Sequence, residues 1–179
     1  MWFLTQEGVD RYDGKYIKHY NFSDDSIKLD SRIALNWLYM DSGNILWVIG
    51  QKGRIFRYDS QHDKFKLAYI HPELIRNKPQ AFLNYGYLDK NDRIWLCYKD
   101  SITWYDIRTG TTLHMPTPVN GEITAIEQTD SNHFFIGTGN GLFHAGIEKG
   151  KLNIMPDKMV EGIGTSVHEL YYHAVSKQL

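Results

Sequence analysis

Histidine is the residue type in this sequence with the widest chemical capability, and it occurs eight times. A zinc or iron site needs three or four ligands that converge, usually from motifs with short fixed spacing. The histidines are scattered singly, and the nearest two, His168 and His173, lie five residues apart, so they would face opposite sides of a strand. We therefore expect no metal site and no cofactor, and ordinary surface or turn positions for the histidines.

Paired carboxylates are the next candidates, because glycoside hydrolysis uses two carboxyl groups about 5–10 Å apart. Three aspartates, Asp41, Asp89 and Asp130, instead begin short polar clusters that are typical of turns. An aspartate at such a position accepts hydrogen bonds from backbone N–H groups two residues further on. Phosphate-binding Gly-x-x-x-x-Gly-Lys loops and Gly-x-Ser-x-Gly nucleophile motifs are both absent from the sequence. We expect this segment not to be an enzyme.

Charge and hydropathy argue against two further classes of function. The 20 Lys and Arg residues against 21 Asp and Glu residues leave no basic excess to neutralise phosphates, so we expect no nucleic-acid partner. The longest apolar run, residues 45–49, is far shorter than the about 20 residues of a membrane helix, so we expect no direct membrane insertion. Polar residues follow the first few positions, which does not fit a secretory signal. The single cysteine, Cys97, excludes an intrachain disulfide.

A repeat provides the elements that would position any site. Each copy is anchored by an aromatic residue followed by apolar residues, at Trp2, Trp47, Trp95 and Phe135. An apolar segment and an aspartate-led turn precede the later anchors, and a Tyr-Asp pair follows the first three anchors. Four short strands in a unit of about 40–50 residues are typical of a β-propeller blade.

We therefore predict an all-β chain: a β-propeller of four-stranded antiparallel blades, with about four blades in one domain, residues 1–179. The blades span approximately residues 1–33, 34–81, 82–121 and 122–166, and residues 167–179 begin with an extra copy of an inner strand. That strand could pair beside residues 2–4 and close a ring of four blades. The chain could equally be a piece of a larger propeller, which the unfinished last repeat slightly favours. Exchange of end strands between two copies is a further arrangement, so we expect a closed monomer or a two-fold dimer.

The repeat resembles the two-component regulator propeller repeat. The resemblance is carried by the Trp-apolar-apolar-x-x-x-Gly strand, the Tyr-Asp pair after it and the Asp-Ser-Gly-Asn turn at 41–44. Residues 2–13 match best, and the copy at Phe135 lacks both the tryptophan and the Tyr-Asp pair. Such repeats form the periplasmic sensor region of hybrid two-component sensor histidine kinases of Bacteroides and its relatives, which detect glycan breakdown products. The resemblance implies a non-catalytic, periplasmic segment of an inner-membrane sensor whose kinase lies outside this chain.

The inner strand of each propeller blade lines the central channel. The repeat places one polar residue at the same position of each inner strand, followed by a second residue that varies between copies. The candidate ligand site consists of Asn36, Trp37, Asn84, Tyr85, Thr124, His168 and Glu169. Polar groups suit the hydroxyls of a sugar and aromatic rings suit its C–H faces, so we expect an oligosaccharide ligand. A channel that holds only water explains the same pattern.

Two other functions fit the repeat. A propeller enzyme of the streptogramin-lyase type would need His168 and Glu169 to act together, although adjacent residues of a strand point to opposite faces. A protein-interaction propeller would use loops such as residues 23–30 and 71–80 to contact its partner. The partners to consider are accordingly an oligosaccharide, a second copy of the chain, or the remaining blades of a parent sensor.

Overall fold

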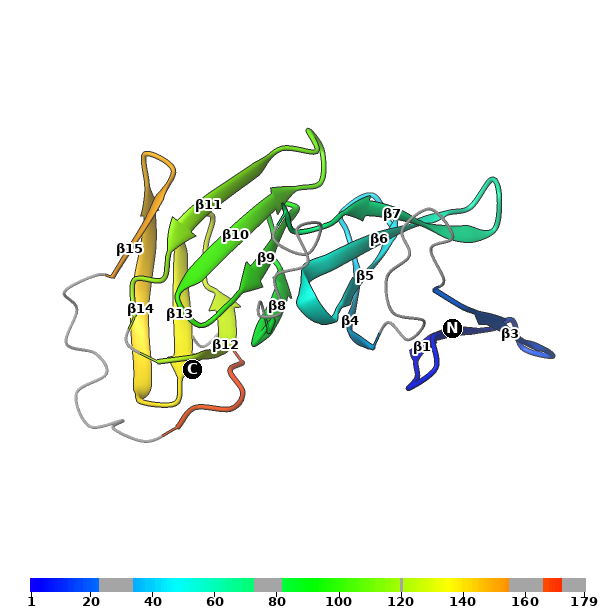
Figure 1. Ribbon diagram of the computed structural model, residues 1–179, viewed down its shortest axis with the longest axis horizontal. Coiled ribbons are helices and arrows are strands. Elements are labelled where there is room, and N and C mark those ends of the chain that lie inside the picture. Colours follow the sequence, from blue (N-terminus) through cyan, green and yellow to red (C-terminus); the bar gives the residue numbers. More distant parts are fainter. Residues whose placement is uncertain (23–33, 73–81, 120, 155–165, 172–179) are drawn as a thin grey trace. The chain divides into compact units, whose positions relative to one another are not determined.

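The computed structural model describes residues 1–22, 34–72, 82–119, 121–154 and 166–171, so the loop at 23–30 and most of that at 71–80 lie outside the described residues. The chain forms two compact units, Met1–Phe82 and Leu83–Leu179, and each contains two antiparallel sheets (Figure 1). The prediction of an all-β chain with blade-like sheets is confirmed. In the described residues, no helix combines the length and the apolar character needed to cross a lipid bilayer.

The first unit contains a three-stranded and a four-stranded sheet. The three-stranded sheet has the order β1-β2-β3, with β1 at Trp2–Leu4, β2 at Val9–Tyr12 and β3 at Ile17–Tyr20. The four-stranded sheet has the order β4-β5-β6-β7, with β4 at Leu35–Met40, β5 at Leu46–Gly50, β6 at Arg54–Asp59 and β7 at Lys64–Tyr69.

The second unit contains two four-stranded sheets. One has the order β11-β10-β9-β8, with β8 at Tyr85–Leu88, β9 at Arg93–Cys97, β10 at Ser101–Asp106 and β11 at Thr112–Pro116. The other has the order β12-β13-β14-β15, with β12 at Ile123–Gln128, β13 at His133–Thr138, β14 at Gly141–Glu148 and β15 at Lys151–Ile154. Each four-stranded sheet is a meander in which consecutive strands pair, and its first strand (β4, β8 or β12) is the inner strand of the predicted blade.

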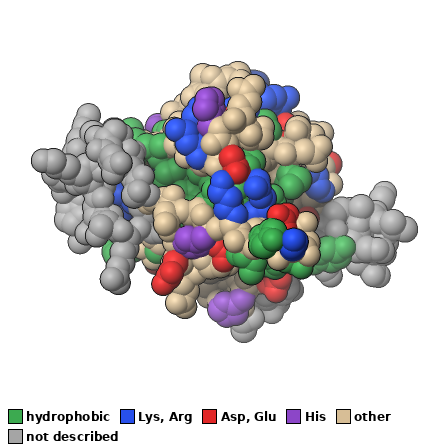
Figure 2. All heavy atoms as spheres, turned by 90° about the vertical axis from the view of Figure 1, so that its right-hand side faces the viewer, with side chains coloured by type: hydrophobic (Ala, Val, Ile, Leu, Met, Phe, Trp, Pro, Cys, Tyr) green, Lys and Arg blue, Asp and Glu red, His purple; other side chains and the backbone are tan. Residues whose placement is uncertain are grey.

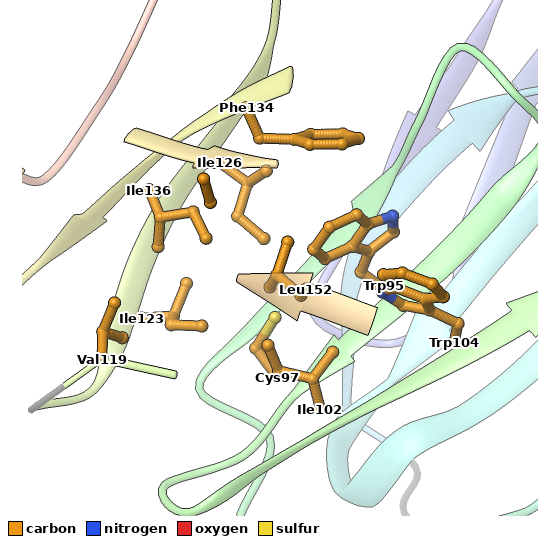
Figure 3. Packing of buried hydrophobic residues seen from close by; sticks show 11 residues of the cluster. Trp95, Cys97, Ile102, Trp104, Val119, Ile123, Ile126, Phe134, Ile136 and Leu152 are labelled. Carbon is orange, nitrogen blue, oxygen red and sulfur yellow. The ribbon is translucent and has the colours of Figure 1, made fainter. Parts of the chain in front are cut away.

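Apolar residues between the two sheets of the second unit form its core. The rings of Trp95 and Trp104, on neighbouring strands β9 and β10, have centroids 5.0 Å apart. Trp95 also contacts Phe134 of β13, at 4.7 Å, so the anchor residue of one sheet packs against the next sheet (Figure 3). Cys97 lies in the same cluster and is fully buried.

A network of charged and phenolic groups connects the two sheets of the first unit. The carboxylate of Asp63, in the turn between β6 and β7, accepts hydrogen bonds from the hydroxyls of Tyr20 and Tyr58 at 2.6 and 2.5 Å. Lys18 Nζ and Arg11 Nη1 lie 2.5 and 3.1 Å from the same carboxylate. Lys18, followed by the tyrosine hydroxyls, lowers the pKa of Asp63. Acidic and basic side chains intermingle on the face shown in Figure 2.

The turns before the anchor strands show why aspartate recurs there. One oxygen of Asp41 accepts hydrogen bonds from the N–H groups of residues 43 and 45, and the other accepts from the indole N–H of Trp47 at 2.8 Å. Asp89 repeats all three contacts and bonds the indole of Trp95 at 2.9 Å. The predicted turn role of these aspartates is confirmed, with one addition: each carboxylate also holds the anchor tryptophan.

The fourth repeat differs from the sequence alignment by one residue. The N–H of Asp41 and of Asp89 donates to the carbonyl four residues on, and in the fourth repeat Thr129, not Asp130, makes this bond, to His133 at 3.0 Å. Thr129 is therefore the structural equivalent of the two aspartates. Asp130 still forms a turn, because it accepts from the N–H groups of Asn132 and His133. Asp130 lies one position later in its turn than Asp41 and Asp89 do in theirs. The residue six positions after it is Ile136, whereas Asp41 and Asp89 precede a tryptophan by six positions.

The expected inner strand that begins at Val167 is not formed in the described residues. Residues 166–171 have no strand assignment. A strand needs a ladder partner, and the backbone bond that this segment makes runs from the Val167 N–H to the Thr138 carbonyl at 3.0 Å. One such bond holds the start of the segment against β13 but does not build a ladder.

Candidate ligand site on the inner strands

Two tyrosines of β8 cover the backbone of β12, the inner strand of the next sheet in the second unit. The hydroxyl of Tyr87 accepts a hydrogen bond from the Gln128 N–H at 3.2 Å, and the hydroxyl of Tyr85 accepts one from the Ile126 N–H. Burial raises the pKa of both phenols. These bonds occupy N–H groups on the edge of β12, which has no strand beyond it in its own sheet.

Asn84 directly precedes Tyr85 in the chain. Its backbone N–H donates to the Cys97 carbonyl at 2.9 Å, which continues the pairing of β8 with β9. Its side-chain Nδ2 is buried and has no hydrogen-bond partner among the described residues. A buried amide donor without a partner is costly, so this group favours an acceptor oxygen.

Thr124 fastens the segment that contains His168 and Glu169. Its hydroxyl donates to the Val167 carbonyl, and the Val167 side chain lies over Gly137, where an added Cβ would come within 2.7 Å of it. A glycine at position 137 is therefore required for the segment to approach β13 this closely. Thr124 is at the predicted position, but its hydroxyl positions a neighbouring segment.

His168 and Glu169 are both exposed. Glu169 is close enough to Tyr85 for its charge to raise the pKa of that phenol. The argument that adjacent strand residues face opposite sides does not apply to this pair, because residues 166–171 are not a strand. The structure thus brings Tyr85, Thr124 and Glu169 to the inner edge of the second unit.

Glu127 belongs to this edge and was missed by the sequence analysis. It lies opposite the anchor Phe135, at the position where the other inner strands have Tyr39 and Tyr87. Burial raises the pKa of Glu127, and the Lys90 ammonium acts in the opposite direction. The exchange of a tyrosine for a glutamate at one repeat position was the signal that could have found it.

Asn36 and Trp37 lie on β4 in the first unit, where Asn36 is exposed and Trp37 is half-buried. Their place in a ligand site stays a prediction. The described residues contain no group of three or more histidine, cysteine or acidic side chains that could hold a metal ion. Three histidines instead pair with aspartates through Nδ1: His19 with Asp10 at 2.5 Å, His62 with Asp59 at 2.7 Å, and His133 with Asp130 at 2.8 Å.

Chemically, the inner strands of the second unit and the segment beside them offer the buried amide donor of Asn84, the phenol of Tyr85 and the carboxylates of Glu127 and Glu169. Carboxylates and amides are paired acceptors and donors for vicinal hydroxyls, and the ring of a tyrosine suits a C–H face.

Solved structures with the same fold include extracellular domains of bacterial regulatory systems. The extracellular domain of the hybrid two component system BT3049 from B. thetaiotaomicron is 20% identical, with a TM-score of 0.63, over 86% of this chain and 23% of that chain. The extracellular domain of BT4673 from the same organism is 15% identical, with a TM-score of 0.67, over 96% of this chain and 23% of that chain. No protein-family model and no curated protein sequence matches the chain.

An enzyme shares the fold as well. A catalytically inactive virginiamycin B lyase from Staphylococcus aureus, solved with quinupristin, is 16% identical with a TM-score of 0.62, over 88% of this chain and 52% of that chain. At identities this low, the structural likeness establishes the fold alone, which is that of β-propeller blades. The chain spans about a quarter of the length of the two extracellular domains and about half of the lyase. The resemblance of the repeat to sensor propellers agrees with the first two structures.

Proposed function

We propose that this chain is a ligand-sensing segment of a periplasmic two-component sensor and that it binds an oligosaccharide at the inner strands of its blades. The observation that carries the proposal is the inner edge of the second unit. There the side-chain Nδ2 of Asn84 is buried without a hydrogen-bond partner among the described residues, and the charges of Glu127 and Glu169 act on the next residue, Tyr85. The fold shared with two extracellular sensor domains supports the sensor role. Signal transfer would require a kinase outside these 179 residues.

Binding of neutral oligosaccharides, measured by titration calorimetry on the whole chain, tests the proposal. We expect Asn84→Ala and Tyr85→Ala to weaken binding by about tenfold or more each, because each removes a polar or stacking contact worth about 1–3 kcal/mol. Asn153→Ala is the matched control, since Asn153 is exposed on the outer strand β15. Unchanged affinity of both inner-edge variants, or equal loss in the control, would remove this site from consideration.

The lyase is a second candidate function, because His168 and Glu169 are both exposed at the end of a segment fixed by Thr124. In this reading His168 would serve as a base and Glu169 as its partner. Incubation of the chain with quinupristin separates the two functions when it is followed by liquid chromatography and fragmentation mass spectrometry, which distinguish the intact antibiotic from an opened isomer of the same mass. The sensor proposal expects the antibiotic to stay intact, and its conversion by the wild type but not by His168→Ala would favour the enzyme.

A further inference from the structure

The turn between β6 and β7 and the turn between β10 and β11 share their hydrogen bonds but differ at one position. In each turn an aspartate at the end of the first strand, Asp59 or Asp106, accepts hydrogen bonds from the N–H groups two and three residues further on. The fourth residue after that aspartate has a left-handed backbone in both turns. It is Gly110, with a φ of 71°, in the turn of the second unit and Asp63, with a φ of 47°, in the turn of the first unit.

The backbone of this turn position favours glycine. Glycine adopts a left-handed conformation without steric cost, whereas a residue with a Cβ adopts it at some cost. A Cβ added to Gly110 would meet nothing within 4 Å among the described residues beyond its chain neighbours, so a side chain there would gain no contact through its Cβ. The aspartate at position 63 is therefore explained by the contacts of its carboxylate rather than by the turn.

Most donors to the Asp63 carboxylate come from the neighbouring sheet, β1-β2-β3. Lys18 Nζ and the Tyr20 hydroxyl, both on β3, lie 2.5 and 2.6 Å from it, and Arg11 Nη1, on β2, lies 3.1 Å from it. The hydroxyl of Tyr58, at 2.5 Å, belongs to the same sheet as the turn. Arg11 also donates a hydrogen bond to the Tyr58 hydroxyl, at 2.9 Å. One carboxylate thus connects two strands of the first sheet to a turn of the second.

The strength of this connection depends on the negative charge of Asp63. Hydrogen bonds to an ionised group are about twice as strong as those between neutral groups. Lys18, followed by the hydroxyls of Tyr20 and Tyr58, lowers the pKa of Asp63, which keeps the carboxylate ionised. A single exposed ion pair contributes little to stability, but here two cations and two hydroxyls share one acceptor. The Asp63 side chain is 36% exposed, so dissolved salt screens its charge.

We propose that the Asp63 carboxylate is a charge-dependent clasp between the first and second sheets, and that removing or screening its charge lets the first sheet open before the rest of the molecule. Ring contacts between the same two sheets, such as Trp2 with Tyr58 at 4.8 Å, involve no ionised group. The clasp is therefore the salt-sensitive part of this junction. The inference does not depend on the proposed function, because all of these residues lie in the first unit.

Hydrogen exchange of the full chain, followed by mass spectrometry of its peptides, measures the opening of each sheet separately. Asp63→Gly removes the carboxylate and leaves a residue that suits the left-handed turn. We expect exchange in residues 9–20 to accelerate about tenfold or more, while exchange in residues 93–106 of the second unit changes less than about twofold. Exchange no faster than in the wild type would show that Asp63 serves the turn alone and would overturn the proposal. Equal acceleration in both segments, a sign of global destabilisation, would overturn it as well.

Gly110→Asp is the matched control, because it places an aspartate at the equivalent turn position of the second unit. The backbone cost of the aspartate is then present without the donors of the first sheet. We expect exchange in residues 101–116 to be unchanged or faster than in the wild type. Slower exchange there would show that an aspartate stabilises this turn without a clasp, which contradicts the proposal.

Two further measurements test the role of charge. Sodium chloride at about 0.5 M should accelerate exchange in residues 9–20 of the wild type several-fold and leave Asp63→Gly unchanged, and an equal response of both proteins would contradict the proposal. Asp63→Asn keeps the shape and one acceptor oxygen of the side chain but removes its charge. Lys18→Met should therefore accelerate exchange in the wild type and have little further effect in Asp63→Asn. Additive effects of these two substitutions would show that Lys18 and Asp63 act separately, which overturns the clasp.

Discussion

The sheet of β8 to β11 and the sheet of β12 to β15, the third and fourth sheets of the chain, begin with equivalent hairpins. Different side-chain contacts stabilise the turns of these two hairpins. In the third sheet the fully buried carboxylate of Asp89 accepts hydrogen bonds from Arg93 Nε at 2.7 Å and from the Trp95 indole at 2.9 Å. In the fourth sheet Thr129 and Phe135 occupy the equivalent positions, and neither contact exists. Both hairpins keep the backbone bond that closes the turn. The comparison shows that the hairpin forms with or without the aspartate–tryptophan contact, so backbone pairing defines the blade.

The aspartates of these two turns, Asp89 and Asp130, differ in solvent exposure. The Asp89 side chain is 0% exposed, and that of Asp130 is 60% exposed. Asp130 pairs with His133, at 2.8 Å, instead of holding a ring of the core. An exposed ion pair contributes little to stability, while removal of a buried carboxylate is costly because it leaves several donors without an acceptor.

The largest effect is expected from Asp89→Ala. The change leaves the Arg93 guanidinium, the Trp95 indole and two backbone N–H groups without their acceptor, and the Arg93 side chain is only 18% exposed. We expect the free energy of unfolding to fall by about 3–5 kcal/mol, measured by urea denaturation. Asp130→Ala is the control, with an expected loss below about 1 kcal/mol. Equal losses would contradict the distinction between the two turns.

The next test installs the missing contact in the fourth sheet. Phe135→Trp alone should reduce the free energy of unfolding by about 1–3 kcal/mol, because it enlarges a buried ring and adds an N–H without an acceptor. Thr129→Asp added to it should recover about 1 kcal/mol through the new hydrogen bond. A double-mutant cycle with no coupling between the two positions would show that Thr129 is not the equivalent of Asp89.

Tyr87→Phe tests the contact that runs from the third sheet to the fourth. The variant leaves the Gln128 N–H without the hydroxyl that accepts it, so we expect a loss of about 1–2 kcal/mol in the free energy of unfolding. Tyr16→Phe, at a tyrosine that is 64% exposed, is the matched control and should change it by less than about 0.5 kcal/mol. Hydrogen exchange at Gln128 should accelerate only in Tyr87→Phe.

The smallest effect concerns Glu127, the fourth-sheet equivalent of Tyr87. Burial raises its pKa above 4.5, so between 4.5 and that higher pKa the folded chain binds more protons than the unfolded chain. The free energy of unfolding contributed by Glu127 therefore decreases as pH rises through this window. Glu127→Gln should remove the decrease, which denaturation curves between pH 4 and pH 7 can detect. A wild type whose stability relative to the variant increases with pH would contradict the assignment.

Much of the fold could be predicted from the sequence because the repeat is strong where the core requires it. Trp47 and Trp95 mark the anchor strands, and Asp41 and Asp89 mark the turns that hold them. The alignment placed the turn of the fourth repeat one residue out of register. It matched Asp130 with Asp41 and Asp89 because all three are aspartates, whereas the structural equivalent is Thr129. The backbone hydrogen bond that Thr129 shares with Asp41 and Asp89 is not visible in a sequence.

The candidate site was less predictable than the strands. The charge of Glu169 acts on Tyr85, but Thr124 binds a carbonyl of the chain itself, and the role of these residues in a ligand site stays a prediction. Glu127 was overlooked because a glutamate at the repeat position where β4 and β8 have tyrosine resembles an ordinary change at an exposed residue. The missing ladder at residues 166–171 depends on a partner strand, and a segment's own sequence does not reveal whether that partner is present.

Cys97 is buried in the core of the second unit, so the reactivity of its thiol reports the opening of that unit. Burial raises the pKa of this thiol, which keeps it protonated and unreactive while the core around it is closed. A thiol reagent can reach it only when the second unit opens, and residues 1–82 contain no other cysteine. The rate of labelling therefore measures the opening of one half of the molecule alone, without any introduced probe.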